Sequence, residues 1–354
     1  MKILNKALMT LCIFHSLFFL ELESCTRLFW NDNGQAKIVA RTMDLFISDE
    51  PQMWTNPRGI HHQSKVDDNG LEWTSLYGNV SISAFHMKDL TTDGLNEHGL
   101  AVHALALVAT QYEKRDDRPG IHYGEWLQYL LDTCQTVEEA LDAHDNFQIV
   151  PIAVNGFVWP LHLMMEDATG DSAIIEFVEG QMNVYHDSQY RVGTNDPTYD
   201  KQLKNLATYE KFGGTKPLPT KTDSVSRFVL ASAYLKELQE PSNVDEAITL
   251  TQQTIARVFQ KDNVSTNAGI SFMGSELRTS TLWTIISDLT HRAYYFFPTG
   301  QPDSIHLNFS DLNFSEGAQV EEINLGSLSE FPTNSIRLQL PIIENRTEML
   351  SDSF

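Results

Sequence analysis

Cys25, Arg41 and Asp44 are the residues whose types and spacing suit nucleophilic catalysis. A cysteine at a processed N-terminus carries a thiol and an α-amino group, and the ordinary pKa of that amine is about 7.7–8.0. Part of the amine is therefore uncharged at neutral pH and can accept the thiol proton or pass one to a leaving amine. A cation such as Arg41 favours the thiolate, and a carboxylate such as Asp44 can hold the amine. These two residues could equally form an ordinary ion pair on the protein surface.

The segment before Cys25 has the layout of a secretory signal peptide. It begins with lysines at positions 2 and 6, continues with a nearly unbroken apolar run over residues 7–20 and ends in the small residue Ser24. A basic start, about 7–15 apolar residues and a polar exit are typical of such peptides, whereas a membrane-spanning helix needs roughly 18 or more. We therefore predict that residues 1–24 are a signal peptide, that the mature chain begins at Cys25, and that the protein is exported.

A cysteine directly after a signal peptide can also be a lipoprotein anchor that is acylated after export. Glu23 and Ser24 are unfavourable residues in the two positions before a lipidated cysteine, so the sequence favours a nucleophile over an anchor. The alternative function is accordingly an exported lipoprotein, or a non-catalytic binding protein, attached through Cys25. Cys25 by itself does not decide between the two interpretations.

The overall composition excludes several classes of protein. The 354 residues are 42% hydrophobic, 20% charged and 10% aromatic, which is typical of a globular chain with a large core and unlike a disordered or fibrous one. The formal net charge of −22 disfavours nucleic acid and anionic membranes as main partners, because both bind basic surfaces. The three cysteines are too few for a disulfide scaffold. After the leader, no apolar run is long enough to span a membrane.

A predicted hairpin brings Arg41 and Asp44 to the N-terminus. Residues 37–40 are apolar and β-branched, and they follow the turn-forming segment 31–34. Because such a turn between two strands favours a hairpin, the strand that leads to Arg41 should pair with the strand that begins at Cys25. Both charged side chains could then reach the terminus.

The rest of the chain combines strand and helix patterns, which predicts one mixed domain over residues 25–354. No G-x-G-x-x-G motif follows a strand, which argues against a nucleotide-binding domain. Strands are predicted over 81–85, 100–107, 157–186 and 279–297, with turns at 96–99 and 167–170, and the tail after Gln301 is predicted to be irregular. Helices are predicted over 125–144, which contains Cys134 as a packed thiol, and over 224–238 and 244–258 with Asp223 and Asn243 as N-caps.

The histidines offer no metal site. His61 and His62, and His98 with His103, lack an H-E-x-x-H or C-x-x-C arrangement. We expect these histidines to be turn or core residues.

Five segments resemble motifs of the choloylglycine hydrolase family, which contains penicillin V acylases and conjugated bile salt hydrolases. The resemblance runs from Cys25 to about Phe297 and covers most of the predicted mature chain. The segments follow the order of the family: Cys25–Arg27, Ala40–Asp44, Asn96–Leu100, Thr194–Pro197 and Ser226–Val229.

The resemblance implies an α+β fold, a four-layer αββα sandwich of the N-terminal nucleophile hydrolase type. It implies an enzyme that hydrolyses linear C–N amide bonds other than peptide bonds through a cysteine thioester, with no cofactor or metal. Candidate substrates are small acyl amides, namely phenoxyacetyl penicillin, conjugated bile salts and N-acyl homoserine lactones. The enzyme would act in the periplasm or outside the cell.

Carried over motif by motif, the resemblance implies that Cys25 is the nucleophile and that Arg41 and Asp44 are its immediate partners. Asn195 matches the asparagine of the family's oxyanion site, and Arg227 matches a second active-site arginine. The side-chain amide of an asparagine can donate to the oxyanion of a tetrahedral intermediate. Because Asn195 precedes Asp-Pro, it would also suit a turn.

Two departures from the family pattern affect the site and the assembly. Ala106 stands where the best-known members carry an asparagine, so one oxyanion donor would have to be a backbone N–H or another side chain. The stretch between Asn195 and Arg227 is short and lacks the insertion that reaches a neighbouring subunit in tetrameric members. This feature resembles the Gram-negative branch of the family, and the protein could still be a homo-oligomer.

Overall fold

The computed structural model describes residues 25–45, 48–153, 158–260 and 279–325, together with the backbone of 271–272 and 275–276. The predicted signal peptide and the end of the predicted irregular tail lie outside the described residues.

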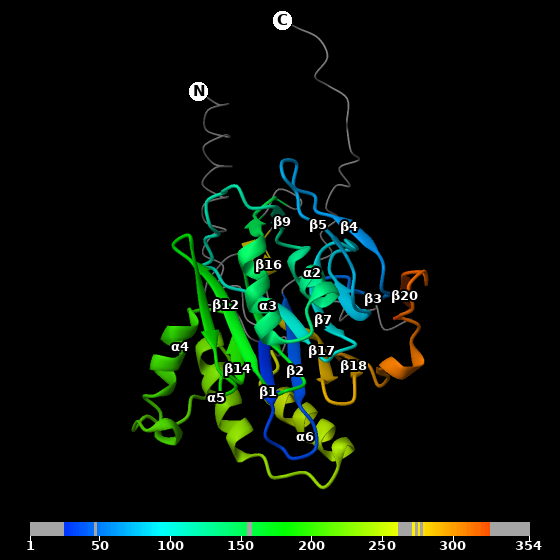
Figure 1. The fold of residues 1–354 in the computed structure, drawn as a ribbon. Helices are drawn as coiled ribbons and strands as arrows, with labels where there is room; N and C mark the ends of the chain where they lie inside the picture. Colours follow the sequence, from blue (N-terminus) through cyan, green and yellow to red (C-terminus); the bar gives the residue numbers. More distant parts are fainter. Residues whose placement is uncertain are drawn as a thin grey trace, which may run out of the picture.

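Two antiparallel sheets form the centre of the fold (Figure 1). We call the first of them sheet A, and its strand order is β14 (Val192–Thr194), β1 (Thr26–Trp30), β2 (Ile38–Leu45), β17 (Ser280–Asp288), β18 (Ala293–Pro298), β19 (Ile305–Asn308). Sheet B has the order β13 (Gln181–His186), β12 (Ser172–Val178), β11 (Leu161–Glu166), β8 (Ala101–Ala106), β7 (Thr91–Asn96), β6 (Asn79–Ser83), β3 (Gln52–Asn56), β20 (Glu321–Ile323).

Helices cover the outer face of each sheet. Against sheet A lie α5 (Ser224–Glu237) and α6 (Val244–Ala256), with α4 (Tyr199–Leu206) beside α5. Against sheet B lie α2 (Trp126–Thr133) and α3 (Val137–Ala143). The layers therefore run helix, sheet, sheet, helix (Figure 1), which confirms the predicted αββα sandwich. Within the described ranges, no helix is long and apolar enough to cross a membrane.

The remaining elements are short. They are the strand pairs β4 (His61–Gln63) with β5 (Glu72–Thr74), β9 (Gly120–His122) with β10 (Gln148–Val150) and β15 (Ser271–Phe272) with β16 (Ser275–Glu276), and the 3₁₀ turns η2 (His144–Asn146), η3 (Glu210–Phe212) and η4 (Phe309–Asp311).

The predicted hairpin at the N-terminus is confirmed. β1 and β2 are antiparallel neighbours, with Thr26 opposite Thr42 and Arg27 opposite Arg41. Both strands are buried at every position except the partly buried Leu45, because sheet B covers one face of sheet A and helices cover the other. This burial explains why residues 37–40 form a continuous apolar run and not an alternating pattern.

Local signals located the helices of the outer layers. Asp223 and Asn243 accept hydrogen bonds from backbone N–H groups three residues later, which confirms both predicted N-caps. The predicted helix over 125–144 is instead two helices, because Cys134 is extended and Thr136 caps a new helix by accepting from Glu139 N. Cys134 therefore follows α2, although its thiol is buried as expected.

Strands predicted in the centre and near the end of the chain are present, but the tail is more ordered than expected. β17 and β18 occupy the segment predicted at 279–297. After Gln301, β19 pairs with β18, and β20 pairs with β3 at the edge of sheet B. These edge strands are formed by pairing with distant strands, and their own short, polar sequences carry little strand signal.

Candidate active site

Cys25 lies at the start of β1, where four of the predicted site residues share one pocket. Cys25, Arg41, Asp44 and Asn195 all line a pocket of about 630 Å³, a volume that includes the space at its open mouth. Cys25 is only 4% exposed. The hairpin supplies the first three residues, and Asn195 directly follows β14, which pairs with β1. Residues that are far apart in the sequence are thus brought together by sheet A.

Arg41 is the cation closest to the thiol. One of its terminal nitrogens lies 3.8 Å from Cys25 Sγ and donates to the carbonyl oxygen of Ala104 at 3.0 Å. Its guanidinium lies over the ring of Trp283, at 4.7 Å from the centroid. Arg41 and Asp44 are both 1% exposed, so the alternative interpretation as a surface ion pair is wrong.

Asp44 is held by three donors on three elements. Its Oδ2 accepts from Arg227 at 2.6 Å and from the hydroxyl of Thr42 at 3.1 Å. Its Oδ1 accepts from the hydroxyl of Thr281 at 2.6 Å. Arg227, on α5, also donates to the carbonyl oxygen of Cys25 at 3.4 Å. Arg227 therefore reaches the site through Asp44 and the backbone of Cys25.

Thr281 is a site residue that the sequence did not indicate. It lies opposite Asp44 in the pairing of β17 with β2, next to an irregularity in the strand register. Its hydroxyl also accepts from the backbone N–H of Gln260 at 2.9 Å. A threonine among the several hydroxyl residues of this strand has no sequence signal for such a role.

Replacing Thr281 by valine should destabilise the protein by about 1–3 kcal/mol, because it leaves a buried carboxylate oxygen and a backbone N–H without their partner. Urea unfolding measures this loss. The matched control is Thr284→Val on the same strand, since the buried hydroxyl of Thr284 has no hydrogen-bond partner. Equal stabilities of the two variants would contradict the role assigned to Thr281.

Burial is the largest influence on the ionisation of the Cys25 thiol. Burial raises its pKa, the positive charges of Arg41 and Arg227 oppose this rise, and the charge of Asp44 adds to it. As long as Ser24 is attached, the nitrogen of Cys25 is part of a peptide bond and has no basicity.

The remaining pocket wall is mostly apolar. Phe85 and Trp159 stack with their ring centroids 5.4 Å apart. Ala106 lines the same pocket, so a methyl group occupies the position where the family pattern has a carboxamide. The other apolar residues of the wall are Met43, Leu45, Ala84, Leu90, Ala104 and Leu161.

Asp49 is an acidic residue in this wall that sequence reasoning also missed. It is 1% exposed and accepts from the indole N–H of Trp283 at 2.8 Å. Burial raises its pKa to about 6, although the hydrogen bond from Trp283 and the charge of Arg41 oppose the rise. The same tryptophan thus contacts Arg41 with its ring face and Asp49 with its N–H.

His98 and His103 are the turn and core residues that the sequence predicts, but His61 and His62 lie in a short strand where His61 is exposed and His62 half-buried. His61 and His62 belong to β4, His98 lies in the turn before β8, and His103 is buried in β8. In the described part of the chain, no group of three or more metal-ligating side chains is close enough to hold a metal ion.

Comparisons with known proteins identify the family of the chain. Residues 25–320 match the profile of linear amide C–N hydrolases of the choloylglycine hydrolase family. A penicillin V acylase of Pectobacterium atrosepticum is 33% identical over 327 residues, 86% of each chain. A bile salt hydrolase/transferase of Clostridium perfringens is 31% identical over 191 residues, 52% of this chain and 57% of that one.

Solved structures show the same architecture. The penicillin V acylase from Agrobacterium tumefaciens superposes with a TM-score of 0.73 at 34% identity, over 86% of this chain and 93% of that one. A mutant of the conjugated bile acid hydrolase from Clostridium perfringens superposes with a TM-score of 0.70 over 85% of this chain and 96% of that one, and at 22% identity it supports the fold alone. The chain therefore belongs to the choloylglycine hydrolase family and is a hydrolase of linear C–N amide bonds.

Proposed function

We propose that the mature protein cleaves small acyl amides through a thioester on Cys25. The observation that carries this proposal is the single pocket in which Cys25, Arg41, Asp44 and Asn195 meet, with Arg227 bound to Asp44. This pocket lies at the residue that becomes the N-terminus if the predicted leader is removed. The proposal therefore includes cleavage after Ser24 and export to the periplasm or the medium.

The reaction would proceed in two displacements. The α-amine accepts the thiol proton, Sγ attacks the amide carbonyl, and a tetrahedral oxyanion forms. Collapse of this intermediate breaks the C–N bond, and the ammonium returns its proton to the departing amine, which leaves a thioester. Water then attacks the thioester with the amine as general base, so that the acid is released and the thiol is restored.

The surrounding residues have distinct proposed roles. Asp44, which Arg227 and Thr281 hold in place, would orient the α-amine. Asn195 would donate to the oxyanion, and Arg41 would favour the thiolate because it lies 3.8 Å from Sγ. Since Ala106 cannot donate from its side chain, the proposal places the second oxyanion donor on a backbone N–H.

The apolar wall supports an acyl group of hydrocarbon or aromatic character. Such a wall, with the stacked rings of Phe85 and Trp159, favours burial of an apolar acyl chain over a charged one. Phenoxyacetyl penicillin, conjugated bile salts and N-acyl homoserine lactones all present such groups. Assaying purified mature protein against one member of each class tests the proposal, and no release of amine from any of them would argue against it.

The intact mass of the exported protein tests the processing step. We expect an unmodified chain that begins at Cys25. A diacylglyceryl adduct on Cys25 would overturn the proposal in favour of the lipoprotein alternative, because its sulfur would be a thioether, which cannot act as the nucleophile.

Asp44 and Asn195 should be distinguishable by their pH profiles. Asp44→Asn removes the charge that stabilises the ammonium form, so the pKa of the amine should fall and the acidic limb of kcat should move to lower pH, with a lower maximum. Asn195→Ala removes only an oxyanion donor, so kcat should drop by about 10²–10³ without a change in the profile.

Measurements of kcat against pH for both variants check this assignment. An acidic limb that moves in Asn195→Ala and stays fixed in Asp44→Asn would reverse the two roles. Unchanged activity in both variants would remove both residues from the mechanism.

A further inference from the structure

Two arginines face each other on the strands that carry the proposed nucleophile. Arg27 on β1 pairs in register with Arg41 on β2, and both side chains are almost completely buried. Like charges directly opposite each other destabilise a sheet, and a buried cation needs a partner. The two guanidinium groups therefore depend on negative charge supplied from another element.

Sheet B supplies that negative charge. Arg27 donates to Glu166 Oε2 from Nε at 2.9 Å and from a terminal nitrogen at 2.6 Å. Arg41 Nε lies 4.0 Å from Asp93 Oδ2, which is close enough for an ion pair but not for a hydrogen bond. The hydroxyl of Tyr294, on β18 of sheet A, donates to the other oxygen of Asp93 at 2.7 Å. Each arginine thus faces one carboxylate of the opposite sheet.

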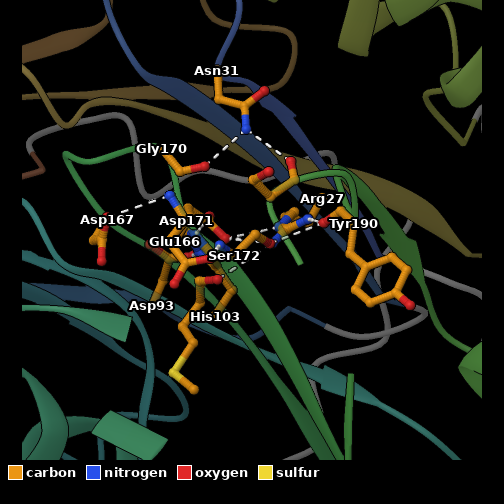
Figure 2. Close-up of polar contacts among 12 residues, drawn as sticks. Arg27, Asn31, Asp93, His103, Glu166, Asp167, Gly170, Asp171, Ser172 and Tyr190 are labelled. Atoms are coloured by element: carbon orange, nitrogen blue, oxygen red, sulfur yellow. Dashed lines mark hydrogen bonds and ion pairs between the residues drawn. The ribbon is translucent and has the colours of Figure 1, made fainter. Parts of the chain in front are cut away.

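His103 joins these two carboxylates. Its Nδ1 lies 2.6 Å from Asp93 Oδ2, and its Nε2 lies 2.6 Å from Glu166 Oε1. Figure 2 shows the imidazole beside Asp93 and Glu166, with Arg27 bonded to the same glutamate. Asp93 and His103 are also opposite residues in the pairing of β7 with β8, so the sheet itself fixes their separation.

The two contacts require a charged imidazole. A neutral imidazole has one N–H, whereas each of these carboxylates needs a donor, and only the imidazolium has two. Burial lowers the pKa of His103, but the charges and hydrogen bonds of Asp93 and Glu166 outweigh it and raise the pKa to about 9. His103 is therefore protonated at neutral pH.

Cations and anions alternate along this row of five side chains. The order is Arg41, Asp93, His103, Glu166, Arg27. Every member is at most 1% exposed, so water screens their interactions weakly. The row begins at the guanidinium that lies 3.8 Å from Cys25 Sγ.

We propose that His103 is a positioning residue for the reaction, which holds Asp93 as the counter-ion of Arg41 beside Cys25. This inference rests on the proposed function, in which Cys25 is the nucleophile. His103 acts through Asp93 and Arg41, because it does not line the pocket itself. The row thus couples the packing of the two sheets to the position of the cation that faces the thiol.

The sign of its electrostatic effect follows from the charges. In the mature protein the charged groups that face Sγ are Arg41, Asp44, Arg227 and the α-amino group of Cys25 itself, which the substitution of His103 leaves in place. With His103 protonated the row has one more cation than anions, and without this charge the row is neutral. Loss of the imidazolium also frees Asp93 to move from Arg41 toward other donors. Both effects weaken the positive potential at Sγ, so the pKa of the thiol should rise.

His103→Gln in the mature protein tests the proposal. Glutamine keeps an N–H donor but has no charge. Iodoacetamide alkylates the thiolate of Cys25, so its rate reports the thiolate fraction without a substrate. The mass of the N-terminal peptide measures this rate between pH 5 and 9. We expect the pH midpoint of the alkylation rate to rise by about one unit in His103→Gln, so that alkylation at pH 7 is roughly tenfold slower. The value of kcat should fall while KM stays nearly unchanged.

Two further variants separate positioning from stability. His144→Gln is the matched control. His144 is a buried histidine that accepts from the indole N–H of Trp126, in the core between sheet B and α2. This substitution should leave the pH midpoint of Cys25 alkylation unchanged. His103→Lys restores a cation and should return the midpoint part of the way. A His103→Gln protein with the wild-type midpoint and kcat, and only a lower Tm, would overturn the proposal.

A measurement on the unsubstituted protein covers the case in which His103→Gln does not fold. Nitrogen NMR of histidine-labelled mature protein should show one imidazole that stays doubly protonated up to about pH 9. If every imidazole is neutral at pH 8, the proposal is wrong. Because alkylation and NMR need no substrate, failure to cleave the tested amides would leave these results intact and would count only against the proposed function.

Discussion

Replacement of Cys25 by serine is expected to reduce amide cleavage to near background while the fold persists. Serine keeps a nucleophilic atom of similar size, but its hydroxyl hardly ionises, whereas the ordinary pKa of a thiol is about 8.5. Cys25 is buried, and burial raises the pKa of its thiol, so a hydroxyl at the same position has even less access to its anion. Release of amine from the best substrate of the panel, together with circular dichroism, measures both effects.

The matched control for this substitution is Cys134→Ser. Cys134 is also a buried free cysteine, but it packs in the core between sheet B and α2 and makes no contact with the pocket. The Cys134→Ser variant should keep its activity and lose only stability. If Cys25→Ser stays within about tenfold of the unsubstituted enzyme, a barrier change of about 1.4 kcal/mol, Cys25 is not the nucleophile.

The parts of the site that adjoin one another in sequence were predictable. A turn between two short apolar segments is enough to place Arg41 and Asp44 beside Cys25, because hairpin pairing is local. The N-caps Asp223 and Asn243 were predictable for the same reason. The motif resemblance added Asn195 and Arg227. In the structure Asn195 lines the pocket, and Arg227 donates to Asp44, which also lines it.

The parts that depend on long-range pairing were not predictable from local patterns. Thr281 meets Asp44 only because β17 pairs with β2 across a long stretch of chain. His103 was expected to be an ordinary core or turn histidine, and its two carboxylate partners come from β7 and β11. Nothing in the sequence near His103 indicates that Asp93 and Glu166 flank it, since that depends on how sheet B is assembled.

The break between α2 and α3 shows a limit of periodicity. The apolar positions of residues 125–144 keep a helical spacing across the break, because both helices pack against the same face of sheet B. Thr136 carried the signal that was missed, since a threonine followed three residues later by Glu139 is a capping sequence.

Retention of a single residue before Cys25 is expected to abolish activity even though the thiol is present. With Ser24 attached, the nitrogen of Cys25 is an amide, which cannot accept the thiol proton or return it to the leaving amine. The pKa of the buried thiol is already raised in the uncleaved chain, so no other feature of Cys25 replaces the lost base. A protein with a specific protease site directly before Cys25 allows the same sample to be assayed before and after cleavage.

In that experiment, activity should appear in proportion to the fraction of chains that begin at Cys25, as measured by intact mass. The Cys25→Ser variant with the same protease site is the control, and it should remain inactive after cleavage. Full activity of the uncleaved protein, with Ser24 still present by mass, would require a base other than the α-amine. The N-terminal nucleophile mechanism would then be wrong, although the assignment of the chain to its family would stand because it rests on the fold and the sequence match.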